Sequence, residues 1–222
     1  MSDDTSSRKV LPPEEAALYR AKTKTENVIR QIRELELEKA LADAETRRVN
    51  SSAVRHLAIN DAIVGQNTDL WILALQTWER RNPGEPITID INSPGGSVTD
   101  GLSLFDQIRR MRRKGHHITT RGTGLVASMA AVLLQAGDVR IMDARAKLLV
   151  HEGSTSFGGG SLSVAEQDDY RAFSELLRVD ILDILCERAT ITRKQMQARW
   201  RRKDWYLGAE EALSLGLCDA VE

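Results

Sequence analysis

The chain has 222 residues, 41% hydrophobic and 28% charged, an ordinary balance for a globular protein with a sizeable core. Its 31 basic and 32 acidic residues leave a net charge of −1, which argues against wholesale nucleic-acid binding. The two cysteines, Cys186 and Cys218, are too few and too far apart for a disulfide framework or a CxxC metal site, so a reducing cytoplasm is the simplest compartment. The N-terminus lacks the apolar stretch of a signal peptide, and no run approaches the roughly 18 apolar residues of a membrane span.

Residues 1–50 differ in composition from the rest, since all 15 glycines lie at or after Gly65. The first ten or so residues are polar and predict a disordered tail, and residues 14–48 have a helical pattern with mixed charges. A weak heptad seam, broken by Lys39, comprises Leu18, Ala21, Thr25, Val28, Ile32 and Leu35. Two interpretations stay open: a solvated helix held by ion pairs, and a docking or oligomerisation arm.

Residues 51–222 predict an α/β domain, because short apolar strands alternate with helices, which favours parallel pairing. The expected strands are 56–64, 87–93, 116–122, 138–143 and 146–151, with a short extended piece at 204–207. The expected helices are 68–81, 102–111, a buried one after Ser128, 164–188, 192–201 and 208–216. In helix 68–81, the apolar face is predicted to comprise Leu70, Leu73, Ala74 and Trp78.

The first segment with candidate chemistry is the turn Ser93-Pro94-Gly95-Gly96-Ser97, which follows a predicted strand. Adjacent glycines let the backbone turn tightly and leave N–H groups facing a cleft, where they can hold a developing oxyanion. A strand-to-helix turn also needs glycines for structural reasons alone, so both interpretations stay open.

The second segment places Ser128 between a predicted strand and a buried helix. A serine among small apolar residues is usually a buried hydroxyl bonded to the backbone. This position would nevertheless suit a nucleophile, because a helix N-terminus supplies N–H donors. The pattern is not the G-x-S-x-G elbow, since Ala130 replaces the second glycine.

The third segment ends in His151, which closes an apolar strand before a Gly-rich loop and is the best candidate for a general base. The other histidines are weaker candidates. His116 and His117 follow the basic run 109–114 and are predicted to face solvent, and His56 has no comparable setting.

Together these segments resemble the ClpP family of serine peptidases over roughly residues 55–222. INSPGGSVTDGLSLFDQI resembles the strand–turn–helix of that family, GLVASMAAVLLQAG its nucleophile segment, LLVHEGS its histidine segment and RKDWYLGAEEALSLGLCDAVE its aspartate segment. The resemblance implies a crotonase-like fold of repeated β-β-α units and a triad of Ser128, His151 and Asp204. It also implies an oxyanion hole of the Gly96 and Met129 N–H groups, with no metal or organic cofactor.

The resemblance further implies a homo-oligomer, with heptameric rings as the family pattern, and an ATP-driven unfoldase as a partner. Glu152-Gly153 stand where the family usually has Gln-Pro after its histidine, which puts peptide preference in doubt. The charged N-terminal extension departs most from the family and looks like that of phage-encoded ClpP-type proteases assigned to head maturation. Capsid proteins are therefore an alternative partner, and the phage assignment is a hypothesis.

Several other residues are alternative candidates for the catalytic roles given to Ser128, His151 and Asp204. Asp168 and Asp169 lie nearer His151 in sequence but fit capping charges at a helix start. Lys147 would allow a Ser–Lys dyad if it shared a face with His151. The basic runs 109–114 and 193–203 are interpreted as solvated helix faces, and both cysteines as packing thiols on helices.

Two rival functions also stay open. One is an enoyl-CoA hydratase-like enzyme of the same fold, which would use the oxyanion turn without a Ser–His–Asp set. The other is a ring subunit or assembly scaffold whose site is dormant.

Overall fold

The computed structural model describes residues 55–153, 163–201 and 203–222, together with residues 28, 31–33, 35–36 and 38–39. The chain divides into two compact units, Met1–Ala42 and Asp43–Glu222. The predicted boundary between an extension ending at residue 50 and a domain beginning at residue 51 falls outside the described residues and stays a prediction.

The described residues of the first unit are helical, as the pattern over residues 14–48 predicts. Among the residues of the heptad seam, Val28, Ile32 and Leu35 are exposed. The other three, Leu18, Ala21 and Thr25, lie outside the described part of the chain.

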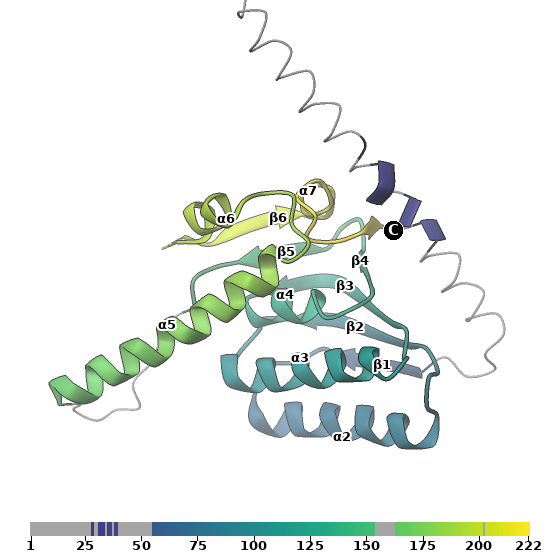
Figure 1. The fold of residues 1–222 in the computed structure, drawn as a ribbon, viewed down its shortest axis with the longest axis horizontal. Helices are drawn as coiled ribbons and strands as arrows, with labels where there is room; N and C mark the ends of the chain where they lie inside the picture. Colours follow the sequence, from purple (N-terminus) through teal and green to yellow (C-terminus); the bar gives the residue numbers. More distant parts are fainter. Residues whose placement is uncertain are drawn as a thin grey trace, which may run out of the picture. The chain divides into compact units, whose positions relative to one another are not determined.

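Within the described part of the second unit, seven strands form one sheet (Figure 1). Their bounds are β1 Arg55–Ile59, β2 Ile87–Ser93, β3 Ile118–Ala127, β4 Val139–Met142, β5 Lys147–Val150, β6 Trp205–Gly208 and β7 Ala220–Val221. The order is β1-β2-β3-β4-β7, and β5 and β6 branch from β3. The predicted parallel pairing is confirmed for every pair except β5–β6, which is antiparallel.

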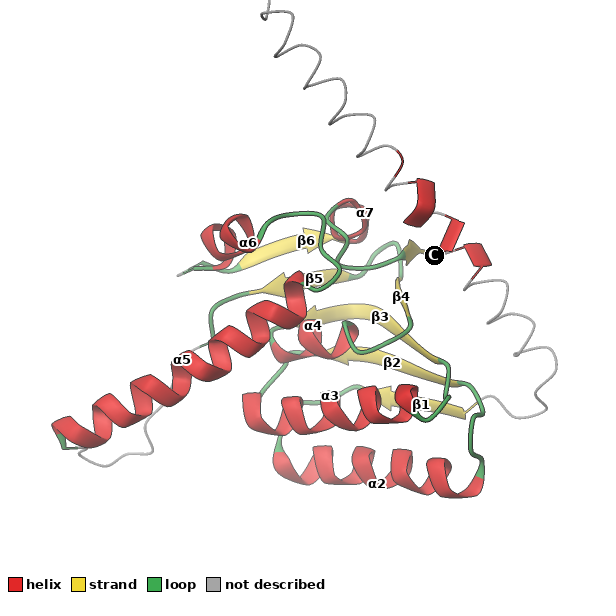
Figure 2. Cartoon of the chain, in the orientation of Figure 1, coloured by secondary structure: helices red, strands yellow, loops and turns green. Residues whose placement is uncertain are grey.

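The described helices of this unit are α2 Gly65–Arg81, α3 Val98–Arg113, α4 Met129–Leu134, α5 Val164–Cys186, α6 Arg193–Trp200 and α7 Ala209–Ser214. Helices α2, α3 and α4 lie side by side along the strands (Figure 2). Helix α5 begins in a capping box, in which Ser163 and Glu166 satisfy each other's backbone N–H groups. Its first half is exposed and points away from the sheet, and its last turns reach the core near α4 (Figure 1).

Strand β3 changes partner along its length, and this change positions the end of the strand. Its first half pairs with β4 through Thr119–Gly122, and its second half pairs with β5 through Leu125–Ala127. Between them the register with β2 shifts, and the side-chain oxygen of Asn92 accepts the Leu125 N–H at 3.0 Å. The bulge re-aims the end of β3 so that it runs beside β5 into α4.

The predicted apolar face of α2 is partly wrong. Ala74 and Trp78 pack against the core as expected, but Leu70 and Leu73 are exposed. Leu75 is instead fully buried, with Trp71 and Ile72 beside it. Apolar residues occur around most of this helix, so the sequence could not show which of them the neighbouring α3 and β1 would cover.

The prediction that His116 and His117 face solvent is also wrong. His116 is buried, and its Nδ1 lies 2.8 Å from the carbonyl oxygen of Glu85. The His117 side chain is only 13% exposed and lies 4.0 Å from Asp138. The basic run before them ends at Lys114, and at the following Gly115 the chain turns back toward the core to begin β3.

Candidate active site

Ser128 occupies the junction between β3 and α4. Its backbone has φ 56° and ψ −120°, and among the described residues no other non-glycine has a positive φ. Its N–H donates to the Leu149 carbonyl at 2.8 Å, which holds the junction against β5. Helix α4 behind it is entirely buried and built from small and aliphatic side chains. A serine held in this uncommon conformation costs about 1–3 kcal/mol, and such strain typically marks functional positions.

The Gly95–Gly96 turn packs directly against this serine. A Cβ atom on Gly95, whose φ is +88°, would lie 2.6 Å from the Ala127 oxygen and 2.7 Å from the Ser128 Cβ. A Cβ on Gly96 would overlap the carbonyl oxygen of Ile63. Both positions therefore require glycine for close backbone approach, independently of any chemistry.

Hydrogen bonds around the turn leave two donors available. Ile63 donates to the Gly95 oxygen at 2.9 Å and accepts the Ser97 N–H at 2.7 Å, while the Gly95 N–H donates to Ser93 Oγ at 3.1 Å. Within the described chain, neither the Gly96 N–H nor the Met129 N–H has an acceptor. Two such donors beside a serine can stabilise an oxyanion.

His151 and Asp204 meet across the antiparallel pair of β5 and β6. Val150 pairs with Trp205, so the residues just beyond these strand ends lie together. Nδ1 of His151 is 3.2 Å from Oδ1 of Asp204. The His151 side chain is 28% exposed and that of Asp204 is 55% exposed, so solvent reaches both. A carboxylate at this distance fixes the ring orientation and the proton on Nδ1, which leaves Nε2 as the basic nitrogen.

A small pocket brings the serine and the histidine to one surface. Its wall is formed by the start of α3, by α4, by the end of β5, by the last turns of α5 and by the end of α6. The lining residues are Val98, Ser128, Met129, Val132, Val150, His151, Gly153, Ile181, Leu185 and Trp200. Apart from Ser128 and His151, the side chains around the pocket are apolar or carry a buried indole, a setting that suits an apolar side chain of a substrate.

Three of the five predicted site residues line this pocket, a fourth bonds one of them, and the fifth belongs to the adjacent glycine turn. Ser128, Met129 and His151 line it, Asp204 bonds His151, and Gly96 belongs to the turn against Ser128. Among the described hydrogen bonds, none joins Ser128 Oγ to His151. Catalytic hydrogen bonds often form fully only when substrate binds, so the absence of this bond is compatible with catalysis.

The rival residues lie elsewhere. The Lys147 ammonium is exposed and donates to the Arg145 carbonyl at 3.2 Å, at the far end of β5 from His151. Asp168 pairs with Arg171 at 3.0 Å within α5. Ser163 and Glu166 form the cap of that helix, so the cap predicted for Asp168 and Asp169 lies a few residues earlier.

The interpretation of both cysteines as packing thiols agrees with the structure. Cys186 packs against the core, and Cys218 is buried in it, although Cys218 follows α7 rather than lying on a helix. Burial raises the pKa of Cys186, and it raises the pKa of Cys218 to about 12. Neutral, buried thiols are poor nucleophiles.

Sequence reasoning missed residues that shape the site without reacting. Ile63 holds the Gly96 turn, Asn92 holds the bulge of β3, and Gly101 lies against the Met129 side chain. For Gly95 the pair of adjacent glycines in the sequence was a signal. One glycine of such a pair can donate its N–H to an oxyanion, while the other allows close approach of a neighbouring segment. Ile63 and Asn92 had no local signal, because each acts on a segment at least 30 residues away.

Among the described residues, no group of three or more His, Cys, Asp or Glu side chains is placed to bind a metal ion. Across the same part of the chain, no helix has both the length and the apolar character needed to cross a membrane.

Comparison with known proteins identifies the family of this chain. The sequence model of the Clp protease family matches residues 42–222. The ATP-dependent Clp protease proteolytic subunit 1 of Chlamydia abortus is 34% identical over 190 residues, which cover 84% of this chain and 94% of the relative. The proteolytic subunit of Deinococcus radiodurans is 28% identical over 171 residues, which cover 75% and 79%. The resemblance inferred from the four motifs is thereby confirmed, and the chain belongs to the Clp protease family of serine peptidases.

Proposed function

We propose that this chain is a ClpP-type serine endopeptidase that cleaves peptide bonds through Ser128, His151 and Asp204. One observation carries the assignment of residues within the family. Ser128, on backbone at positive φ, lines the same pocket as His151, and His151 Nδ1 lies 3.2 Å from the Asp204 carboxylate.

In the acylation step, Ser128 Oγ attacks the carbonyl carbon of the scissile bond while His151 Nε2 takes the hydroxyl proton. The carbonyl oxygen becomes an oxyanion, which accepts hydrogen bonds from the Gly96 and Met129 N–H groups. Asp204 keeps the imidazole oriented and stabilises its positive charge. When the tetrahedral intermediate collapses, the C–N bond breaks and His151 returns the proton to the leaving amine.

In the deacylation step, a water molecule attacks the ester formed on Ser128. His151 takes a proton from that water and then returns it to Ser128 Oγ as the C–O bond to the enzyme breaks. The acid product leaves, and the site regains its starting state without a cofactor.

Assembly and partners are part of the same proposal. The Chlamydia and Deinococcus relatives are named as proteolytic subunits of an ATP-dependent protease. We extend this to a homo-oligomeric ring, heptameric by family resemblance, that receives protein substrate from an ATP-driven unfoldase in the cytoplasm. A phage origin, with capsid proteins as substrate, stays a prediction based on the N-terminal extension.

One observation favours a second candidate, a ring subunit or scaffold with a dormant site. Within the described chain, Ser128 Oγ has no hydrogen bond to His151. The hydratase-like alternative has no comparable support, because the matching family model is that of the Clp protease.

A fluorophosphonate probe, which reacts with activated serines, separates the two candidates. We expect the wild-type protein to be labelled at Ser128 and Ser128→Ala to be unlabelled, while Ser103→Ala, an exposed serine on α3, is labelled normally. An assembled but unlabelled wild-type ring would support the scaffold. Equal labelling of wild type and Ser128→Ala would contradict the assignment of the nucleophile.

A further inference from the structure

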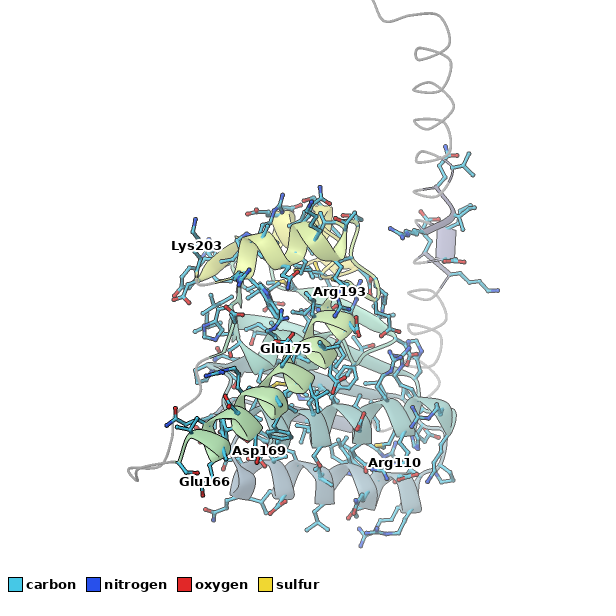
Figure 3. All side chains as sticks on the ribbon, turned by 60° about the vertical axis from the view of Figure 1, so that its left-hand side comes forward. Arg110, Glu166, Asp169, Glu175, Arg193 and Lys203 are labelled. Atoms are coloured by element: carbon cyan, nitrogen blue, oxygen red, sulfur yellow. The ribbon has the colours of Figure 1, made fainter. Side chains whose placement is uncertain are left out.

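Basic side chains gather on the segment that leads into the candidate active site. Residues 192–203 contain six of them and no Asp or Glu: Arg193, Lys194, Arg199, Arg201, Arg202 and Lys203. Those that the structure describes are exposed. Figure 3 shows Arg193 and Lys203 on this part of the molecule, well away from Arg110 on α3. The whole chain is almost neutral, so this concentration of charge is local.

Three of these cations form what we call the basic rim: Arg199, Arg201 and Lys203. Within the described chain, none of the three is in an ion pair, whereas the neighbouring Arg193 pairs with Asp183 and Arg178 pairs with Glu175. An exposed cluster of uncompensated cations produces a positive potential that attracts acidic groups.

The basic rim borders the residues proposed for catalysis. Lys203 directly precedes Asp204, which bonds His151. The Arg199 guanidinium lies 5.1 Å from the centre of the Trp205 ring, and Trp205 pairs with Val150 beside His151. The carbonyl of Trp200, which lines the pocket, accepts the Glu152 N–H at 3.3 Å.

Carboxylates near the site do not cancel this charge. Asp204 is bonded to His151, and Glu152 lies within electrostatic reach of Arg178. The pKa of Glu175 on α5 is lowered, first by its hydrogen bond to Arg178 and more weakly by the charge of Arg201. Asp204 therefore has the His151 imidazole as its partner, while Glu152 and Glu175 share Arg178. Arg201 is partly offset by Glu175, and Arg199 and Lys203 keep the basic rim in excess of positive charge.

We propose that the basic rim selects peptide substrates that carry Asp or Glu close to the scissile bond. This inference rests on the proposed endopeptidase activity and adds a substrate class to it. The apolar pocket takes one side chain, while Arg199, Arg201 and Lys203 attract acidic side chains next to it. An exposed ion pair changes affinity by roughly two- to five-fold, so two acidic residues give about a ten-fold preference.

The test compares three internally quenched peptides with one apolar residue at the centre. Two flanking positions carry Glu in the first peptide, Gln in the second and Lys in the third. At low salt we expect kcat/KM to fall in the order Glu, Gln, Lys, by about ten-fold between the first two. Because the attraction is screened by ions, the preference shrinks when salt rises from about 50 mM to about 500 mM.

Matched variants test whether the preference for acidic peptides depends on the basic rim. Arg201→Gln with Lys203→Gln removes two charges of the basic rim, and we expect the Glu peptide to lose most of its advantage while the Gln peptide is cleaved as before. Arg81→Gln with Arg113→Gln is the control, because it removes two exposed charges at the C-terminal ends of α2 and α3. The control is expected to retain the full preference.

Binding to Ser128→Ala separates this inference from the proposed activity. If wild type cleaves none of the peptides, the endopeptidase proposal fails, and the basic rim is judged by fluorescence anisotropy of the labelled peptides on Ser128→Ala. Tighter binding of the Glu peptide, lost in the Arg201→Gln/Lys203→Gln background, supports the basic rim. Equal kcat/KM and equal affinity for the Glu and Gln peptides at low salt would overturn it, as would an unchanged preference in the rim variant.

Discussion

Gly95 illustrates how single residues shape this site without reacting. The turn that contains it is so close to Ser128 that even one methyl group on Gly95 would fall within 3 Å of three atoms of residues 127–129. His151 and Asp204 depend on a different kind of contact, an exposed hydrogen bond between two strand ends. Activity is therefore expected to fall when a side chain is added at Gly95 and also when the charge of Asp204 is removed.

Gly95→Ala is expected to inactivate the enzyme, with Gly84→Ala as its control. Both glycines have positive φ, +88° and +79°, so both variants lose about 1–3 kcal/mol of stability to backbone strain. A Cβ on Gly84 meets nothing within 4 Å, whereas a Cβ on Gly95 displaces Ser128. We expect kcat/KM to fall about 100-fold or more in Gly95→Ala alone. Peptide hydrolysis and urea unfolding of both variants check this, and normal activity of Gly95→Ala would contradict the described contact.

Asp204→Asn removes the charge that orients His151 while keeping the size of the side chain. By analogy with other Ser–His–Asp enzymes, we expect kcat to fall by about 10⁴. Because Asp204 is exposed, the melting temperature should change little. Asp106→Asn on α3, also exposed, should alter neither quantity. If Asp204→Asn retained full activity, another group would have to orient the histidine.

At the scale of elements, several boundaries agree with the sequence because local signals set them. The alternation of ITIDINS coincides with β2, and the apolar run after Ser128 coincides with α4. The buried face of α2 was predicted only in part, because it depends on which neighbours pack against a helix that is apolar on more than one side. The antiparallel pairing of β6 with β5 could likewise not be predicted from the local sequence pattern, because it joins segments more than 50 residues apart.

Two leucines on α2 test this description of its faces. Leu75 is fully buried, so Leu75→Ala should lower the free energy of unfolding by about 2–5 kcal/mol. Leu70 is 62% exposed, so Leu70→Ala should change it by no more than about 0.5 kcal/mol. Urea denaturation of the two variants measures the difference. Equal losses would mean that Leu70 is also covered, for example by another subunit.

At the scale of the whole molecule, a buried cluster of charges ties the C-terminal segment to the sheet and to the end of α5. The Asp219 carboxylate accepts hydrogen bonds from the Arg140 backbone N–H at 2.8 Å and from its guanidinium, and it also bonds Arg188. Burial alone would raise the pKa of Asp219, but the hydrogen bonds and charges of Arg140 and Arg188 hold it below its ordinary value.

This lowered pKa predicts a pH-dependent stability. Since the folded protein binds the Asp219 proton less readily than the unfolded chain, the stabilisation is complete above the ordinary pKa of 3.8 and is lost as pH falls below it. Near neutral pH, Asp219→Asn should cost about 3–5 kcal/mol, because it leaves the buried Arg140 without its counter-charge. We expect the gap between wild type and variant in urea unfolding to narrow in acid. A gap that is constant down to the acid limit would contradict the described cluster.

Ring assembly is tested on the intact chain. Native mass spectrometry is expected to show a homo-oligomer for both wild type and Ser128→Ala. If the N-terminal extension is removed by self-cleavage, the mass of the wild-type chain is lower than that of the full sequence. The Ser128→Ala chain then keeps the mass of the full sequence. A full-length monomer or dimer in both proteins would contradict the proposed ring-forming protease and favour a scaffold.

The sequence by itself determined the α/β class, most element positions and the identity of the candidate residues, because strand alternation, glycine turns and motif order are local properties. It also carried the family resemblance that links Ser128, His151 and Asp204. Only the tertiary structure decided that Gly95 must lack a side chain, that Ile63 clamps the turn, that His116 is buried and that the basic rim borders His151. Each of these facts depends on contact between segments distant in sequence, and such contacts arise only when the strands pair and the helices pack.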